Sequence, residues 1–426
     1  MKQSDKSFNW HVYIFSVELK KTLGLFDALA IGIGAIVGAG IFVVTGVAAG
    51  LAGPALLLSL VISACISAFT ALSFAELAAV IPKEGGGYEF AHELISPFAG
   101  FIAGWLWLLS NLVVGAVVSL GFASYLAIFI PLPVNLMAAA ACIAVTIINY
   151  LGARESGLVN DVLVVIKLLI LALFIAFGIG AVKFENFSPF MPNGGVGVMQ
   201  GAALIFFAYS GFARITLVSE EVKNPTKTIP LAIILALGIS TVIYILVSFT
   251  AVGIIGYQEL ASSGSPLADA AMSESKNAAN LISVGALAAT LSVLLTTLLG
   301  LSRISFAMAE NRDLPSWFAK LHPVRATPYN TILVFGLIMT IFAVFTDLMR
   351  AIAISNFASL LYYAIANYAA LKLEKPIYSR MIPVVGLITC VLLLFFLTRD
   401  AWIIGSIALL SGVIYYYTIK IQYEVG

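Results

Sequence analysis

A single basic residue, Lys167, lies inside the apolar run VLVVIKLLILALF at residues 162–174. It follows Gly157, where a helix is predicted to begin, by ten residues, which is about 15 Å along the helix axis. An amine can bind and release a proton, and apolar surroundings favour its neutral form. Proton exchange is therefore the chemistry that this residue offers.

The acids nearest to Lys167 in the predicted fold all lie towards a membrane surface: Asp27, Glu76 and Asp161. A lysine side chain spans only about 6 Å, so it cannot easily extend to the surface from the middle of a core about 30 Å thick. Two other interpretations stay open. The side chain extends along a tilted helix to the surface, or it only holds neighbouring helices together.

A second unusual pattern is the glycine-rich stretch GIGAIVGAGIFVVTG at residues 32–46. Glycine costs about 1 kcal/mol relative to alanine in a helix interior. Either these glycines allow close helix packing, or the chain is unwound at Val37–Gly40 to expose its backbone to a cavity. The stretch FFAYSGF at 206–212 repeats the pattern. Interrupted helices in corresponding halves favour an inverted-repeat transporter.

The elements that must position these residues are membrane helices. The chain has 426 residues, 61% hydrophobic and 10% charged, against about 25% charged in soluble domains. The apolar runs are about twenty residues long and do not alternate as barrel strands would. They predict an all-α membrane protein with twelve helices, near residues 25–50, 54–80, 98–130, 134–152, 158–180, 197–217, 229–256, 281–307, 328–346, 348–371, 380–398 and 401–420.

The distribution of lysine and arginine predicts the orientation. With both termini in the cytoplasm, 17 of the 22 basic residues fall on the cytoplasmic side, Arg214 among them, and four on the outer side, which leaves Lys167. This asymmetry is typical of a multi-pass protein of the cell membrane.

Composition and spacing also exclude several functions. The net charge is +1, and no basic patch indicates nucleic-acid binding. The cysteines are isolated and no histidine has a metal-ligand spacing, so neither a metal nor a cofactor is expected. An enzyme would need a nucleophile with a base at membrane depth, and a channel would need a ring of acids or carbonyls. A channel is kept as the alternative from another class.

The residues resemble the amino acid, polyamine and organocation permeases, and most closely their cationic-amino-acid-transporter branch. The motifs that carry the resemblance are GIGAIVGAGIF, AELAAVIPKEGGGYEF, FFAYSGF, SEEVKNPTKTIPLAI and RISFAMAENRDLPSWFAKLHP. The resemblance implies the LeuT-type fold, with five-helix inverted repeats whose first and sixth helices are unwound. The implied regions are a cytoplasmic N-terminus at 1–24, repeats at 25–180 and 197–371, and two further helices at 380–420.

Unwound helices present free amides, which suit a carboxylate, and free carbonyls, which suit an ammonium. A zwitterionic amino acid carries both groups. The resemblance implies a carboxylate site at the amides of Gly38, Ala39 and Gly40, an aromatic gate at Phe212 and a bordering Ile41. It places the amine site at the carbonyls of Ile36, Phe207, Ala208 and Ser210. Packing of these aromatic residues against other helices or lipid is the plainer alternative.

The resemblance also suggests a role for Lys167. Sodium-coupled relatives bind a second sodium ion at positions that correspond to Gly34, Val37 and Ser292, where an ammonium could replace the ion. Members of this branch often have an acid after the GF of the sixth helix, whereas this chain has Ala213. We therefore expect proton-coupled symport of mainly neutral amino acids. Sodium coupling and exchange remain alternatives. The oligomeric state is not indicated, although one chain is expected to be the functional unit.

Overall fold

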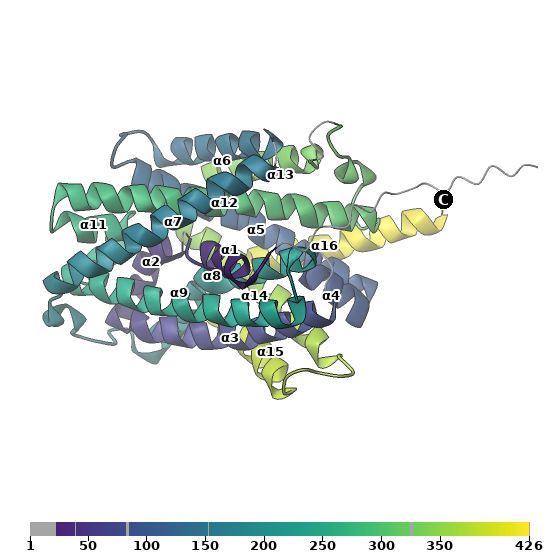
Figure 1. The fold of residues 1–426 in the computed structure, drawn as a ribbon, viewed down its shortest axis with the longest axis horizontal. Helices are drawn as coiled ribbons and strands as arrows, with labels where there is room; N and C mark the ends of the chain where they lie inside the picture. Colours follow the sequence, from purple (N-terminus) through teal and green to yellow (C-terminus); the bar gives the residue numbers. More distant parts are fainter. Residues whose placement is uncertain (1–22, 39, 82–84, 152, 324–326, 426) are drawn as a thin grey trace, which may run out of the picture.

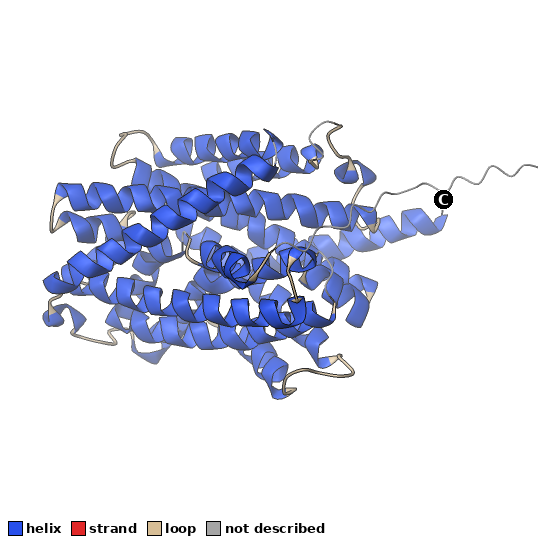
Figure 2. Cartoon of the chain, viewed as in Figure 1, coloured by secondary structure: helices blue, strands red, loops and turns tan. Residues whose placement is uncertain are grey.

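The computed structural model describes residues 23–38, 40–81, 85–151, 153–323 and 327–425. Regular structure in these residues is helical (Figures 1 and 2), apart from an isolated bridge between Leu23 and Val222. Residues 1–22, which are most of the predicted cytoplasmic N-terminus, lie outside the described residues.

The α-helices are α1 (Leu25–Ile36), α2 (Thr45–Ala52), α3 (Leu56–Val80), α4 (Gly87–Leu94), α5 (Pro97–Leu126), α6 (Val134–Leu151), α7 (Ala153–Gly178), α8 (Gly194–Tyr209), α9 (Pro225–Ile255), α10 (Tyr257–Ser262), α11 (Pro266–Met272), α12 (Lys276–Glu310), α13 (Tyr329–Phe345), α14 (Leu348–Leu371), α15 (Met381–Leu394) and α16 (Arg399–Val425). A π-helical segment, η1 (Gly40–Val44), and the 3-10 segments η2 (Gly53–Ala55), η3 (Ile179–Ala181), η4 (Phe184–Phe187), η5 (Ser210–Glu221) and η6 (Ser316–Ala319) complete the helical structure.

Each of the twelve predicted segments overlaps helical structure. Within the described residues, nine stretches are long and apolar enough to cross a membrane. The first of these nine stretches, Leu25–Val80, covers two predicted helices. Two further predicted helices correspond to Tyr329–Phe345 and Met381–Leu394, which are apolar but shorter and are not among the nine. The chain is thus an all-helical protein with many membrane-length segments. The number of crossings and the inverted repeat remain predictions.

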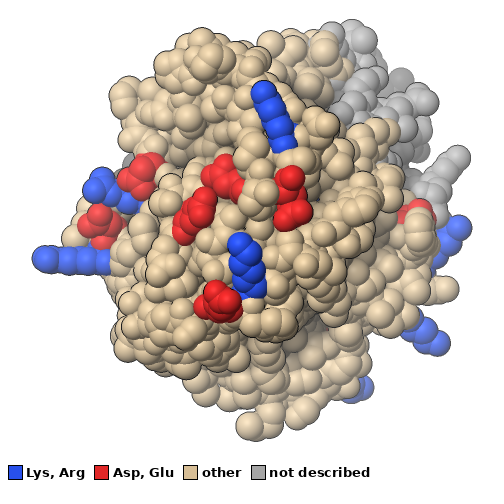
Figure 3. Space-filling model, turned by 90° about the vertical axis from the view of Figure 1, so that its left-hand side faces the viewer, with Lys and Arg blue, Asp and Glu red and all other residues tan. Residues whose placement is uncertain are grey.

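The outer helices expose apolar side chains that water would not tolerate in such numbers. Examples are Leu136 and Ile147 on α6, Val165 and Leu169 on α7, and Leu337 on α13, each at least 55% exposed. A lipid environment removes the cost of that exposure. Charged side chains instead occupy the ends: Figure 3 shows acidic and basic residues interspersed on the end that lies at the left of Figure 1.

The first segment lies at the centre of the bundle (Figure 1). Helix α1 packs against α9 and η5, while α5 packs against α12 and α14. Lys223 donates its backbone N–H to the Leu23 carbonyl at 2.8 Å, next to the isolated bridge, and so ties the start of α1 to the end of η5. The segments that carry the two glycine-rich stretches are therefore neighbours.

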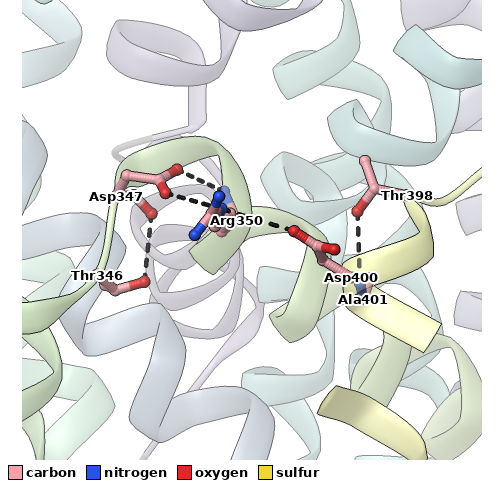
Figure 4. A network of polar contacts seen from close by, with 6 residues as sticks. All are labelled: Thr346, Asp347, Arg350, Thr398, Asp400 and Ala401. Atoms are coloured by element: carbon pink, nitrogen blue, oxygen red, sulfur yellow. Dashed lines mark hydrogen bonds and ion pairs between the residues drawn. The ribbon is translucent and has the colours of Figure 1, made fainter. Parts of the chain in front are cut away.

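An exposed ionic network joins the starts of α14 and α16 (Figure 4). The Asp347 carboxylate caps α14 by accepting the backbone N–H of Arg350 at 2.9 Å. The Arg350 Nε lies 3.2 Å from Asp347 Oδ2 and 3.6 Å from Asp400 Oδ2. All three side chains are more than half exposed.

Candidate functional site

The first segment is interrupted where its glycines predict. Helix α1 ends at Ile36, and the helical structure resumes at Gly40. The Gly38 N–H donates to the Ile36 carbonyl at 2.8 Å. In a continuous helix it would bond to the carbonyl of Gly34, four residues earlier. The interruption therefore leaves the Gly34 carbonyl free for another donor.

The sixth segment changes its helix type instead of unwinding. Helix α8 ends at Tyr209, and the chain continues directly as the 3-10 segment η5. The Ser210 N–H and its hydroxyl both donate to the Phe207 carbonyl, the hydroxyl at 2.8 Å. The prediction of an unwound stretch here is wrong. The helix continues as a 3-10 helix, in which each N–H bonds to the carbonyl three residues earlier instead of four.

The two segments touch at these points. A Cβ atom added at Gly211 would overlap the backbone of Ala35 and Ile36, and one added at Gly40 would overlap Ala208. Glycine is needed at both positions because the backbones approach so closely.

A small cavity lies between the two segments. Six of the nine residues predicted to bind substrate line it: Ile36, Gly38, Gly40, Phe207, Ala208 and Ser210. Its volume is about 20 Å³, room for about one water molecule. The helices must therefore move apart before an amino acid can enter.

The other three predicted substrate residues are placed differently. Ala39 lies outside the described residues. Ile41 is buried beyond the cavity lining. Phe212 is also fully buried, with its ring centroid 5.9 Å from that of Phe74 and 5.3 Å from that of Tyr363. Neither Ile41 nor Phe212 contacts the cavity in this conformation.

The carbonyls assigned to the substrate amine already accept protein donors. The Tyr244 hydroxyl donates to the Ile36 carbonyl at 2.6 Å and lies 3.1 Å from that of Ala208. The Tyr363 hydroxyl donates to the Ser210 carbonyl at 2.8 Å. These tyrosines come from α9 and α14, and nothing in the sequence near them indicated such a role. Protein hydroxyls thus occupy the predicted amine site in this closed conformation.

Lys167 lies next to the first interruption. Its side chain is fully buried, and Nζ donates to the free Gly34 carbonyl at 2.5 Å. A longer contact of 3.5 Å reaches Ser292 Oγ, which in turn donates to Asn160 Oδ1 at 2.6 Å. Of the three residues predicted to surround the amine, Gly34 and Ser292 therefore contact it. Among the bonds of the described residues, none joins Lys167 to Val37.

Comparison of the sequence with known proteins assigns the chain to a family. The sequence profile described as "Amino acid permease" matches residues 23–421. The chain belongs to this amino acid permease family. The family lies in the amino acid, polyamine and organocation superfamily, as the motifs predicted, and membership indicates a membrane transporter of amino acids.

Individual relatives cover nearly the whole permease. It is 37% identical to an uncharacterised transporter of Mycobacterium tuberculosis over 404 residues, 94% of this chain and 91% of the relative. It is 34% identical to the branched-chain amino acid permease of Bacillus subtilis, covering 90% and 89% of the two chains. Identity is also 34% to the methylthioribose transporter of Bacillus subtilis, covering 94% of each chain.

The permease has one charged site residue that the sequence analysis misplaced. Arg214 was counted with the cytoplasmic loops, but it is half-buried in η5 and lines the cavity between the two segments. Its assignment to a loop is wrong, because Arg214 lies in η5, inside the predicted segment 197–217. Its side of the membrane remains a prediction. Its position three residues after Gly211 was the available signal.

Arg214 also lines a second small cavity with a more polar wall. Ser110, Asn111, Ser359 and Tyr363 contribute to that wall from α5 and α14. The Ser110 and Ser359 hydroxyls lie 2.6 Å apart. The two cavities are neighbours, because Ser210 and Arg214 line both of them.

Proposed function

We propose that this permease is a secondary active transporter that carries a proton together with mainly neutral amino acids. In this proposal the chain crosses the cell membrane twelve times in a LeuT-type arrangement, with both termini in the cytoplasm, and works as a single chain. The amino acid binds between the interrupted first segment and η5. The carbonyl-bound amine of Lys167 is the observation that carries the proposal.

The contacts of Lys167 explain how a proton could control the helices. When the amine is charged, its hydrogen bond to Gly34 and its contact with Ser292 hold α1 near α12. A carbonyl and a hydroxyl do not neutralise the charge, and in this mechanism the amine exchanges its proton when the surrounding helices open. Once neutral, the amine holds the two helices less strongly, and the first segment is free to move.

The cavity supports neutral substrates. Its lining holds neither aspartate nor glutamate, and a cationic side chain buried there would have no acid to pair with. The printed function of one relative, a branched-chain amino acid permease, is compatible with this class. Free backbone groups suffice for the common zwitterionic part of every amino acid.

Uptake by reconstituted vesicles tests the proposal. With an imposed inward proton gradient, we expect saturable uptake of labelled alanine or leucine that persists when choline replaces sodium. Lys167→Ala and the closer-fitting Lys167→Met should abolish the dependence on the gradient, whereas the exposed Lys183→Ala should not. Gradient-driven uptake by both Lys167 variants at the wild-type rate would refute proton coupling through this amine. A requirement for sodium would favour the alternative mechanism.

A further inference from the structure

Arg214 is held inside the bundle by neutral groups. Its Nη1 donates to Thr296 Oγ1 at 2.6 Å and its Nη2 to Thr297 Oγ1 at 2.8 Å, both on α12. A guanidinium has five N–H donors, so these bonds use only part of its capacity. The remaining donors are available beside the cavity that Arg214 lines.

The charge of Arg214 has no acidic partner among the side chains that the structure describes. A guanidinium stays protonated in proteins, and hydroxyl partners do not cancel its charge. Permanent charges within a membrane normally pair with an opposite charge or mark a substrate path. The polar wall next to Arg214 and its place at the cavity favour the substrate path.

Lys167 adds a second cation close by. Lys167 contacts Ser292, and Arg214 bonds to Thr296, four residues further along α12. Four residues are about 6 Å along a helix. Two positive groups therefore attach to successive turns of one helix, and within the described region no carboxylate accompanies them. A negatively charged ligand would offset this excess.

We infer that Arg214 binds the side-chain carboxylate of an acidic amino acid, so that aspartate and glutamate are substrates alongside neutral ones. The inference rests on the proposed function, in which the backbone near Gly38 and Gly40 holds the α-carboxylate. Because Arg214 lines the same cavity, the side chain of an amino acid held there would face the guanidinium once the helices move apart. The planar fork of N–H groups matches a carboxylate and can bind both of its oxygens.

Competition between isosteric substrates tests this without any substitution. In this assay, wild-type protein in vesicles takes up labelled alanine in the presence of one unlabelled competitor. The inhibition by aspartate is compared with that by asparagine, and the inhibition by glutamate with that by glutamine. We expect each acid to compete at least tenfold better than its own amide, and labelled glutamate to enter. Amides that compete as well as or better than the acids would overturn the inference while leaving alanine transport, and hence the proposed function, intact. Absence of any amino acid uptake would refute both.

Variants identify the group responsible. Arg214→Gln should bring acid and amide to parity as competitors of whatever alanine uptake the variant retains, whereas Arg350→Gln should keep the wild-type preference. Arg214→Lys, which retains the charge and loses the fork, should show an intermediate preference. A preference for acids that survives Arg214→Gln would refute the assignment to this residue. If the Arg214 variants do not fold, thermal stabilisation of the wild type by glutamate but not by glutamine supports a site for an acidic side chain, and equal stabilisation by the two overturns the inference.

Discussion

Two arginines of this permease lie in opposite surroundings. Arg350 is exposed at the start of α14, with the carboxylates of Asp347 and Asp400 at 3.2 and 3.6 Å. Arg214 is half-buried beside the cavity and bonds to two threonine hydroxyls. The exposed cation has its charge balanced by the chain itself, and such pairs contribute little to stability. Among the described side chains the half-buried cation has no acidic partner, and in the inference above a substrate carboxylate balances its charge.

The largest effect should come from separating the segments that hold the interior site. Gly211→Ala forces a methyl group against the backbone of Ala35 and Ile36. We expect uptake below a tenth of the wild-type rate and a loss of about 2–3 kcal/mol in unfolding free energy, as for other overpacked sites. Gly238→Ala, on α9 with no atom within 4 Å of the added carbon, is the matched control. Equal behaviour of the two variants would contradict the close approach.

The next largest effect should come from giving Arg214 a carboxylate partner within the chain, as Arg350 has. Ala213 lines the second cavity together with Arg214. In Ala213→Asp we expect uptake of labelled glutamate to fall about tenfold, because an internal carboxylate competes for the guanidinium. Alanine uptake should change by less than threefold. If glutamate and alanine uptake fall equally, the arginine does not act on the side-chain carboxylate.

A smaller effect concerns the hydroxyl that joins the two segments from α9. Tyr244→Phe removes the hydrogen bond to the Ile36 carbonyl and the 3.1 Å contact with the Ala208 carbonyl. Because one hydrogen bond is lost and a buried carbonyl is left without its donor, we expect a loss of about 1–2 kcal/mol in unfolding free energy, measured in detergent. Tyr368→Phe alters a ring that is 41% exposed and should have no measurable effect. An unchanged stability of Tyr244→Phe would show that water replaces the hydroxyl.

The smallest effect should come from the exposed network itself. Arg350→Gln removes both ion pairs, yet exposed pairs are each worth less than about 1 kcal/mol. We expect a change within about 0.5 kcal/mol, which shrinks further at high salt, and uptake within twofold of the wild type. A loss of transport in this variant would break the contrast between the two arginines.

Sequence patterns predicted helices better than they predicted side-chain placement. Long apolar runs and the cost of glycine in helices located the segments and the break after Ile36, because these effects are local. The prediction that the sixth segment is unwound was wrong, because Ser210 makes short-range hydrogen bonds that stabilise a 3-10 helix there. Whether such bonds prevail depends on tertiary packing, which the sequence does not display.

The missed site residues share one cause. Tyr244, Tyr363 and Ser359 come from helices distant in sequence, and each is an ordinary residue within an apolar run. Arg214 was misplaced because its charge was taken as the sign of a loop, an inference that fails wherever a cation lines an internal cavity. The contacts of Lys167 with Gly34 and Ser292 were predicted from the resemblance to sodium-coupled relatives and not from a local pattern.

The Gly34 carbonyl has one further consequence. It is available to Lys167 only because the Gly38 N–H turns to Ile36 instead. If the chain wound one turn further into regular helix, that N–H would recapture the carbonyl and displace the amine. In the proposed mechanism, the conformation of this turn and the protonation of the amine are therefore linked. A ligand that reshapes the turn would change how tightly the amine holds its proton, and by the same linkage protonation would change the affinity for that ligand.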